Sequence, residues 1–428
     1  MEVLFDWILI VLGTIIAFKC YKNIIYNSRS SVANFVLIVC YLFCVIPILL
    51  NYIIGKPQYS TVYWYKPFIK PMNNELISII YDIYMMASLL ILYLYIKKTR
   101  KTENYVRFDE TKEITITLFN NKIVSIICIF SPLLYIFISG TWKSYLVYNT
   151  TTLRGFTEGN YSVVMNSLLL LSMFVFFNLV YRGKFSLNKF FLSILYFFAI
   201  IWISGKRFMI ANIFIMILFF INQMEITNAS KKKLSLIIPI LSFFILSFSA
   251  FYLIKIKPLS NTSFNSVYEM LRVDFGRDDV IKYVISKEFF EKEMILDYRG
   301  QSFVSLALSF IPRMIWKTKP YPHYIYLTSS ILKLPITKLP AGTTPSWYEM
   351  CLCNFSYIGF ALGCIGLYVM CFITDKTKNL EIKSLFLMLI IAILTQSVDA
   401  YIVYILILIA NAIFKFIFNG KNLKIVWR

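Results

Sequence analysis

Cationic side chains beside long apolar segments are the residues of this chain best suited to hold an anionic group. A guanidinium fork matches phosphate geometry, and a cation at the edge of a bilayer is costly unless it is paired or faces water. A lipid-linked phosphate is the anion we expect, and snorkelling of the same side chains to lipid headgroups is the alternative. The candidate pyrophosphate-binding residues are Arg154, Arg207, Arg272, Arg313 and Lys319.

Three further side chains could move a proton. His323 is the only histidine and could act as a general base near neutral pH, with a structural role as the alternative. Glu349 stands at the outer end of an apolar segment, where it could be a general base or could pair with an arginine. Asp274 lies two residues after Arg272, so the two could aim at one site from a helix start. A solvated, salt-bridged helix face is the alternative for that pair.

Two tryptophans near these residues could bind a sugar. Trp316 lies between Arg313 and Lys319, and Trp347 lies two residues before Glu349. Aromatic faces with interleaved cations suit both sugar stacking and pyrophosphate binding. A single histidine and the absence of a C-x-x-C pair argue against zinc, and no acidic metal cluster is apparent, so we expect no metal and no cofactor.

The elements that must position these residues are membrane helices. Of the 428 residues, 59% are hydrophobic and 15% are charged, with a mean hydropathy of +0.69. This composition excludes a soluble enzyme and a disordered chain. Apolar runs long enough to cross a bilayer predict an all-α polytopic membrane protein of about eleven spans, or ten if the last two merge. The predicted spans are 3–19, 32–54, 76–96, 123–141, 161–181, 190–203, 208–222, 234–254, 347–373, 384–397 and 400–418.

The distribution of lysine and arginine predicts the orientation. With the N-terminus outside and the C-terminus in the cytoplasm, the cytoplasmic segments are much richer in these residues than the short outer ones. The net charge of +21 is then mostly a topology signal and an anionic-lipid contact, and nucleic acid is not an expected partner.

One external segment, residues 255–346, is far longer than the other connections. It separates residues 1–254, with eight spans, from residues 347–428, with three. Residues 266–293 within it read as one amphipathic helix with mixed charge, and the apolar run Phe303–Ile311 is too short to span. A loop of this length indicates function.

The sequence around these residues resembles the Wzy family of oligosaccharide repeat-unit polymerases, which make O-antigen and capsule. The matching residues run Gly300-x-Ser302-Phe303, then Ile311-Pro312-Arg313-x-x-Trp316-x-x-Lys319-Pro320, then Thr344-Pro345-Ser346-x-x-Glu349-x-x-x-x-Asn354-Phe355-x-x-x-Gly359. The many spans with one large late external loop also match. The family often has Gly after Asn-Phe, where this chain has Ser356.

The resemblance implies a glycosyltransferase of the bacterial cytoplasmic (inner) membrane. It would move a growing glycan from undecaprenyl pyrophosphate to the terminal sugar of a new lipid-linked repeat unit, at the outer face. Its partners would be undecaprenyl-pyrophosphate-linked glycans, membrane lipids and a chain-length regulator protein. An O-antigen ligase that transfers glycan to lipid A core is an alternative enzyme, and a polysaccharide flippase or other transporter is an alternative of another class. The missing internal repeat and the scarcity of mid-span charges argue against a transporter.

Overall fold

The computed structural model describes residues 1–27, 30–60, 62–102, 122–146, 160–180, 187–204, 208–223, 263–308, 314–339, 342–377 and 379–396, together with residues 311, 405, 408 and 409. Every regular element in these ranges is helical, so the predicted helical class is confirmed for the described chain. Within the described ranges, four segments are long and apolar enough to cross a membrane: α1 (Glu2–Tyr26), Ala33–Ile53, α5 (Glu75–Thr102) and α16 (Ile358–Lys376). The predicted count of eleven spans and their orientation stay predictions.

The shorter apolar helices fall where other spans are predicted. They are α6 (Lys122–Ile138), α7 (Asn160–Val180), α8 (Leu187–Ser204), α9 (Phe208–Gln223) and α17 (Leu380–Thr395). The predicted span 234–254 and most of 400–418 lie outside the described residues.

The chain forms two compact units. The first contains Met1–Arg107, Glu225–Lys376 and Ile390–Asp399, and the second contains Phe108–Met224, Thr377–Leu389 and Ala400–Arg428. In the second unit, the Trp202 indole donates to the Tyr145 carbonyl at 2.7 Å, and the rings of Phe176 and Tyr196 stack at 3.7 Å. The described residues of the candidate site lie in the first unit.

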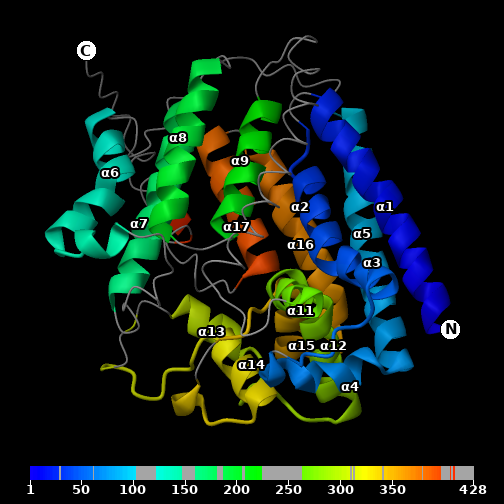
Figure 1. Ribbon diagram of the computed structural model, residues 1–428. Coiled ribbons are helices and arrows are strands. Elements are labelled where there is room, and N and C mark those ends of the chain that lie inside the picture. The colour runs from blue at the N-terminus through cyan, green and yellow to red at the C-terminus, as the bar shows by residue number, and fades with distance from the viewer. Residues whose placement is uncertain are drawn as a thin grey trace. The chain divides into compact units, whose positions relative to one another are not determined.

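The two ends of the first unit are each held by polar contacts. At one end, the amino group of Met1 pairs with Glu75 at 2.9 Å, and Lys56 pairs with Glu2 at 2.9 Å. At the other end, the Asp375 carboxylate accepts hydrogen bonds from Val32 N at 2.8 Å and from Tyr95 Oη at 2.9 Å. We call these the Met1 end and the Asp375 end. Helices α1, α5 and α16 therefore run from the Met1 end to the Asp375 end, as Figure 1 shows.

The second apolar segment returns in the opposite direction and contains a π turn. Helix α2 (Ala33–Cys40) passes into η1 (Tyr41–Val45) and then into α3 (Ile46–Ile53). Pro47 follows the π turn, and because proline has no N–H, the carbonyl of Phe43 cannot receive its usual helical hydrogen bond. The helix is thus continuous in direction but leaves carbonyl oxygens open to other partners.

Short helices gather at the Met1 end (Figure 1). They are η2 (Tyr63–Phe68), α4 (Ile69–Met72), α11 (Phe264–Phe275), α12 (Asp278–Ile285), η6 (Ser286–Phe290), α13 (Gln301–Ala307), α14 (His323–Leu332), η7 (Ile336–Lys338) and α15 (Trp347–Phe355). The prediction of one amphipathic helix over 266–293 is wrong, because the chain turns at Gly276 between α11 and α12. A Cβ at Gly276 would lie 2.7 Å from the Arg272 carbonyl oxygen, so only glycine fits this tight turn.

The predicted span 347–373 is also divided. Helix α15 ends at Phe355, and Ser356 has φ 52° and ψ −132° before α16 begins at Ile358. This backbone region is one that essentially only glycine adopts without strain. Glu349 and Trp347 therefore belong to a short helix of their own, outside the long apolar helix α16.

Candidate functional site

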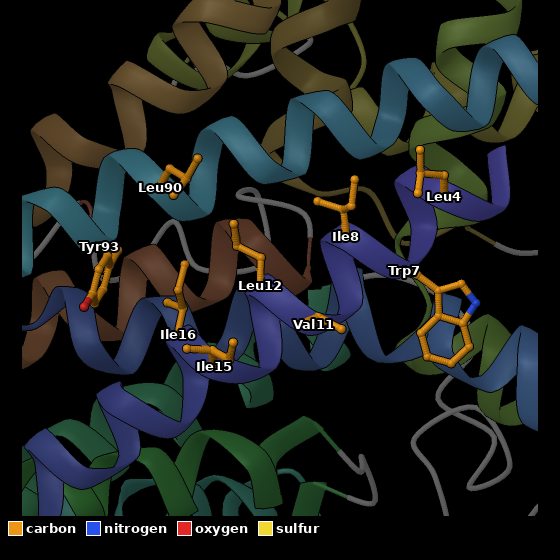
Figure 2. Close-up of a pocket in the computed structure, with 9 residues that line it drawn as sticks. All are labelled: Leu4, Trp7, Ile8, Val11, Leu12, Ile15, Ile16, Leu90 and Tyr93. Carbon is orange, nitrogen blue, oxygen red and sulfur yellow. The ribbon is translucent and has the colours of Figure 1, made fainter. Parts of the chain in front are cut away.

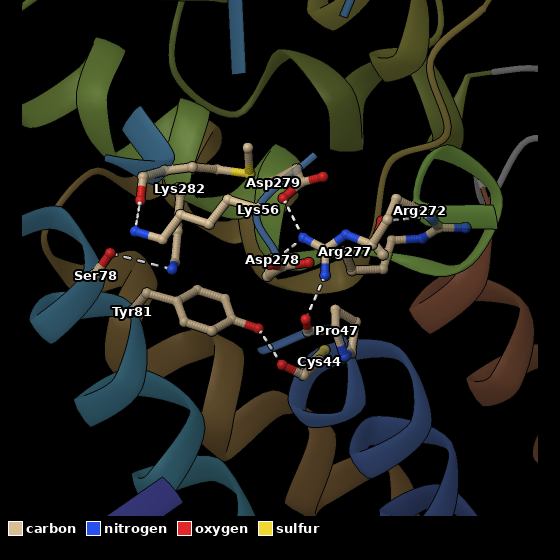
Figure 3. Close-up of polar contacts among 12 residues, drawn as sticks. Cys44, Pro47, Lys56, Ser78, Tyr81, Arg272, Arg277, Asp278, Asp279 and Lys282 are labelled. Carbon is tan, nitrogen blue, oxygen red and sulfur yellow. Dashed lines mark hydrogen bonds and ion pairs between the residues drawn. The ribbon is translucent and has the colours of Figure 1, made fainter. Parts of the chain in front are cut away.

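A buried ion-paired cluster joins α11 and α12. The Arg272 guanidinium is 2% exposed and donates to Asp278 at 2.8 Å and to Asp279 at 2.7 Å (Figure 3). The second oxygen of the Asp279 carboxylate accepts a hydrogen bond from the Tyr59 hydroxyl. Asp278 and Asp279 open α12, where negative charge also complements the helix N-terminus. Arg272 is thus occupied by the protein itself, contrary to its predicted role as a pyrophosphate ligand.

The π turn supplies the remaining partners of this cluster. Arg272 Nη1 also donates to the Pro47 carbonyl. The backbone N–H of Arg277 donates at 3.0 Å to the Phe43 carbonyl, which is the carbonyl that Pro47 leaves unpaired. The Tyr81 hydroxyl donates to the Cys44 carbonyl at 2.7 Å. The irregular turn in one membrane helix therefore anchors the corner between α11 and α12.

Arg277 is the second buried arginine. It is 1% exposed, its guanidinium donates to the Gly276 carbonyl at 3.0 Å and to the Thr395 carbonyl at 2.7 Å, and it lies 5.4 Å from the centre of the Phe43 ring. Carbonyl oxygens near a helix C-terminus carry partial negative charge, so Thr395 is a suitable partner for a cation. Arg277 also interacts electrostatically with Glu349.

A lysine extends the buried charge along α12. Lys282 is 2% exposed, donates to the Ser78 hydroxyl at 3.1 Å and lies 5.2 Å from the centre of the Tyr81 ring (Figure 3). Burial raises the pKa of the nearby Asp279 carboxyl to about 6, although Arg272 opposes that rise. Cations and carboxylates thus neutralise one another within the protein, and the cluster's clearest role is to hold the short helices on the bundle.

A second cluster brings together two of the sequence stretches that carry the family resemblance and His323, which lies between matching stretches. The backbone N–H of Ser302 in α13 donates to the Asn354 side-chain oxygen in α15 at 3.1 Å. The Ser302 hydroxyl and the Nδ1 atom of His323, the first residue of α14, are hydrogen-bonded at 2.9 Å. Asn354 in turn donates to the Met350 carbonyl at 2.7 Å, which fixes its amide. We call Ser302, His323 and Asn354 the motif cluster.

His323 is the member of this cluster that could take part in proton transfer. It is 3% exposed, and its Nε2 atom has no hydrogen-bond partner among the described residues. Burial lowers the pKa of the imidazole to about 4, and the helix N-terminus at which it stands also disfavours a positive charge. The ring is therefore neutral at pH 7, with one nitrogen fixed by Ser302 and the other available.

Glu349 caps its own helix. The backbone N–H and the hydroxyl of Ser346 both donate to the Glu349 carboxyl group, which forms a capping box at the start of α15. The side chain is fully buried, and burial raises its pKa to about 7, against the opposing effect of the Ser346 hydrogen bonds and of Arg277. The Glu349 carboxyl thus has a pKa near neutral pH, and its oxygens accept hydrogen bonds from Ser346.

Aromatic residues pack α13 and α15 against α16. The Trp347 indole N–H donates to the Gly363 carbonyl at 2.8 Å, and the Phe303 ring lies 5.3 Å from that of Phe355. A Cβ at Gly359 would lie 2.4 Å from the Cys351 carbonyl oxygen, so glycine permits α15 and α16 to touch there. Trp347, predicted to bind substrate, is therefore engaged with the membrane helix.

The segment before α14 carries the more accessible predicted residues. Lys319 donates to the Ile311 carbonyl at 2.8 Å, which closes a loop around Trp316. The Trp316 indole is half-buried and donates to the Thr318 hydroxyl at 3.0 Å. Met314 and Ile315 on this loop are 90% and 79% exposed. This combination of exposed apolar side chains and cations is typical of a segment at a membrane interface.

The structure leaves four predicted residues without a described side chain. Arg154, Arg207 and Arg313 lie outside the described residues, and Asp274 is placed in α11 with its side chain undescribed. Of the residues that are described, Ser302 is hydrogen-bonded to both His323 and Asn354, and Glu349 interacts electrostatically with Arg277. Among the described residues, no three His, Cys, Asp or Glu side chains gather as metal ligands would.

Several residues of the site carry no role in the sequence-based prediction. Ser302 and Asn354 belong to the matching motif, but only the fold shows that they meet. The spacing Ser346-x-x-Glu349 is a capping-box signature and could have predicted both the start of α15 and the role of Glu349. Comparison with protein-family models, with curated proteins and with solved structures finds no match.

Proposed function

We propose that this chain is a membrane-embedded glycosyltransferase that polymerises oligosaccharide repeat units carried on undecaprenyl pyrophosphate. The observation that supports this best is the motif cluster. The matching stretches Gly300–Phe303 and Thr344–Gly359 are separate in sequence, yet Ser302 is hydrogen-bonded to Asn354, and it also contacts His323, which lies outside the match. Residues that carry the family resemblance thus lie together at one end of a bundle of apolar helices, where a lipid-linked substrate could present its headgroup.

The reaction needs cations for the leaving group. The acceptor hydroxyl oxygen bonds to the anomeric carbon, the bond from that carbon to the pyrophosphate oxygen breaks, and undecaprenyl pyrophosphate leaves with the electron pair. Lys319 closes the loop that carries Trp316, and Arg313 belongs to the same segment. We assign the developing negative charge to Arg313 and Lys319, with Arg154 and Arg207 as further candidates, and the sugar platform to Trp316. Arg272 acts instead as a positioning residue for α11 and α12.

The proton of the acceptor hydroxyl needs a base. His323 is neutral at pH 7, and its Nε2 atom has no partner among the described residues. In the tautomer whose Nδ1–H donates to the Ser302 hydroxyl, Nε2 can accept this proton. A bound pyrophosphate would favour the imidazolium form and so raise the basicity of His323 when substrate is present. The Glu349 carboxyl already accepts hydrogen bonds from the N–H and the hydroxyl of Ser346, so we rank it second to His323 as the candidate base.

The test uses the purified full-length protein in lipid nanodiscs with lipid-linked repeat units isolated from cells that lack it. We expect a ladder of lipid-linked polymers from the wild type and none from Arg313→Ala. Lys317→Ala, an exposed lysine of the same segment, is the matched control and should give the wild-type ladder. Polymer of wild-type length from Arg313→Ala would remove Arg313 from the site.

The same assay separates the alternative functions. Transfer only to added lipid A core would identify a ligase, and movement of repeat units across vesicles without new glycosidic bonds would identify a transporter. Single-turnover rates against pH for His323→Gln and Glu349→Gln then identify the base. The variant that lacks the base should lose the rate and its dependence on pH, and an unchanged profile would clear that residue.

A further inference from the structure

An apolar groove runs along the membrane helices α1 and α5, away from the motif cluster. It encloses about 570 Å³ and is lined on α1 by a stripe from Leu4 to Ile16 and on α5 by Leu90 and Tyr93 (Figure 2). Leu4, Ile8, Leu12 and Ile15 follow a spacing of three to four residues, so they share one helix face. The groove is thus a continuous apolar surface depression that is open along the two helices.

A cationic cavity adjoins the groove toward the Asp375 end. It encloses about 400 Å³, shares Tyr93 with the groove, and is lined by Lys19, Lys22 and Lys97 together with Asn23 and Asn27. Lys19 comes four residues after Ile15 and Lys22 three residues after Lys19, so these two lysines continue the same face of α1, while Lys97 is on α5. The apolar groove and the cationic cavity therefore form one surface with a charged end.

The three lysines are available for a ligand. Each is exposed, and none pairs with a carboxylate in the part of the chain that the structure describes. Lys19 donates to the Tyr93 hydroxyl at 3.3 Å, and Lys22 lies 4.6 Å from the centre of the Phe18 ring. Three uncompensated ammonium groups around one cavity favour a phosphate, and basic pockets between membrane helices on the cytoplasmic side are typical binding sites for anionic lipid headgroups.

We propose that this surface binds one anionic phospholipid, with its phosphate among Lys19, Lys22 and Lys97 and an acyl chain along the groove. The groove is long enough for one acyl chain. From Lys22 to Leu12 helix α1 rises about 15 Å, which is about half of the hydrocarbon thickness of a bilayer, and the groove continues beyond Leu12 to Leu4. The site is separate from the proposed glycosyl transfer and does not depend on it.

The test measures lipid binding by native mass spectrometry of the purified full-length protein. The protein is equilibrated with dioleoyl phosphatidylglycerol or with dioleoyl phosphatidylcholine, and dissociation constants are compared. The wild type should bind phosphatidylglycerol with a clear excess in affinity. Because each lysine near an anionic headgroup contributes about fivefold, Lys19→Gln/Lys22→Gln/Lys97→Gln should weaken that binding about 100-fold.

Matched variants separate a defined site from general charge. Lys98→Gln changes a neighbouring exposed lysine that does not line the cavity and should leave the affinity within about twofold. Ile15→Trp should fill the groove and weaken binding of the long-chain lipid, whereas Leu94→Trp, an exposed position outside the groove, should not.

Three results would overturn the proposal. The first is equal affinity of the wild type for the two lipids, and the second is an equal loss in Lys98→Gln and in the triple variant. The third is tight binding of undecaprenyl phosphate without binding of phosphatidylglycerol, which would make a polyprenyl chain the occupant. Because no arm measures polymer synthesis, failure here is distinct from failure of the proposed glycosyl transfer.

Discussion

Replacing Glu349 by glutamine should change how the stability of the protein depends on pH. The Glu349 carboxyl is fully buried, and burial raises its pKa from the ordinary 4.5 to about 7. Below about pH 4.5 the carboxyl is protonated in the folded and the unfolded chain, and its contribution to stability is fully present. As the pH rises through 7, the unfolded chain loses its proton first, so stability falls.

The size of the effect follows from the two pKa values. A rise from 4.5 to about 7 corresponds to about 3 kcal/mol of unfolding free energy lost between those pH values. For the first unit, which contains Glu349, this loss of free energy corresponds to a fall of about 5–10 °C in the unfolding midpoint. Glutamine at the third helical position keeps the capping box but does not titrate, so Glu349→Gln should lack this loss.

The assay is thermal unfolding of the purified full-length protein between pH 4.5 and pH 8. We expect the midpoint of the wild type to fall relative to that of Glu349→Gln by about 5–10 °C across this range. Glu293→Gln is the control, since the Glu293 side chain is 65% exposed, and it should follow the wild type. Parallel curves for the wild type and Glu349→Gln would refute the reasoning. A wild type that gains stability with pH relative to Glu349→Gln would mean that pairing with Arg277 outweighs burial.

Three other predictions use the same unfolding measurement. Burial lowers the pKa of His323 to about 4, so its contribution to stability is present above about pH 6.5 and is lost as the pH falls toward 4. His323→Gln should therefore lose less stability than the wild type as the pH falls over this range. Equal dependence of the unfolding midpoint on pH in the variant and the wild type would contradict this. Arg272→Met should cost about 3–5 kcal/mol because it leaves two aspartates buried without their cation, and Arg272→Met/Asp278→Asn/Asp279→Asn should recover most of that loss. Ser356→Gly should raise stability by about 1 kcal/mol because Ser356 has φ 52°, whereas Ser356→Ala should not; a gain from both would point away from backbone strain.

The long apolar helices could be predicted from the sequence because each is marked by a continuous run of apolar residues, which is a local feature. The predicted spans 3–19, 32–54 and 76–96 agree with α1, Ala33–Ile53 and α5 to within a few residues at most ends. The break at Ser356 could not be predicted in this way, since Phe355-Ser356-Tyr357 contains neither glycine nor proline and the apolar run continues through it. Tertiary packing, including the contact of Gly359 with α15, determines that turn.

The residue types alone do not reveal the partners of the predicted site residues. Ser302 and His323 are separate in sequence, and only the fold shows that they are hydrogen-bonded. For Arg272 the sequence allows either an anion-binding role or a salt-bridged helix face, and the fold places two carboxylates and the Pro47 carbonyl around it. Pairing across more than two hundred residues depends on the whole bundle, which no local spacing encodes.

The contact at the Asp375 end has a consequence for the time course of synthesis. Val32 donates to Asp375, which lies 343 residues further along the chain. At a synthesis rate of about 5–20 residues per second, about 20–70 s separate the appearance of the two residues. During that interval α1, Ala33–Ile53 and α5 are already made while α16 does not yet exist. These three segments can therefore pack against one another and against the elements made before residue 358, but their contacts with α16 can form only at the end of that interval.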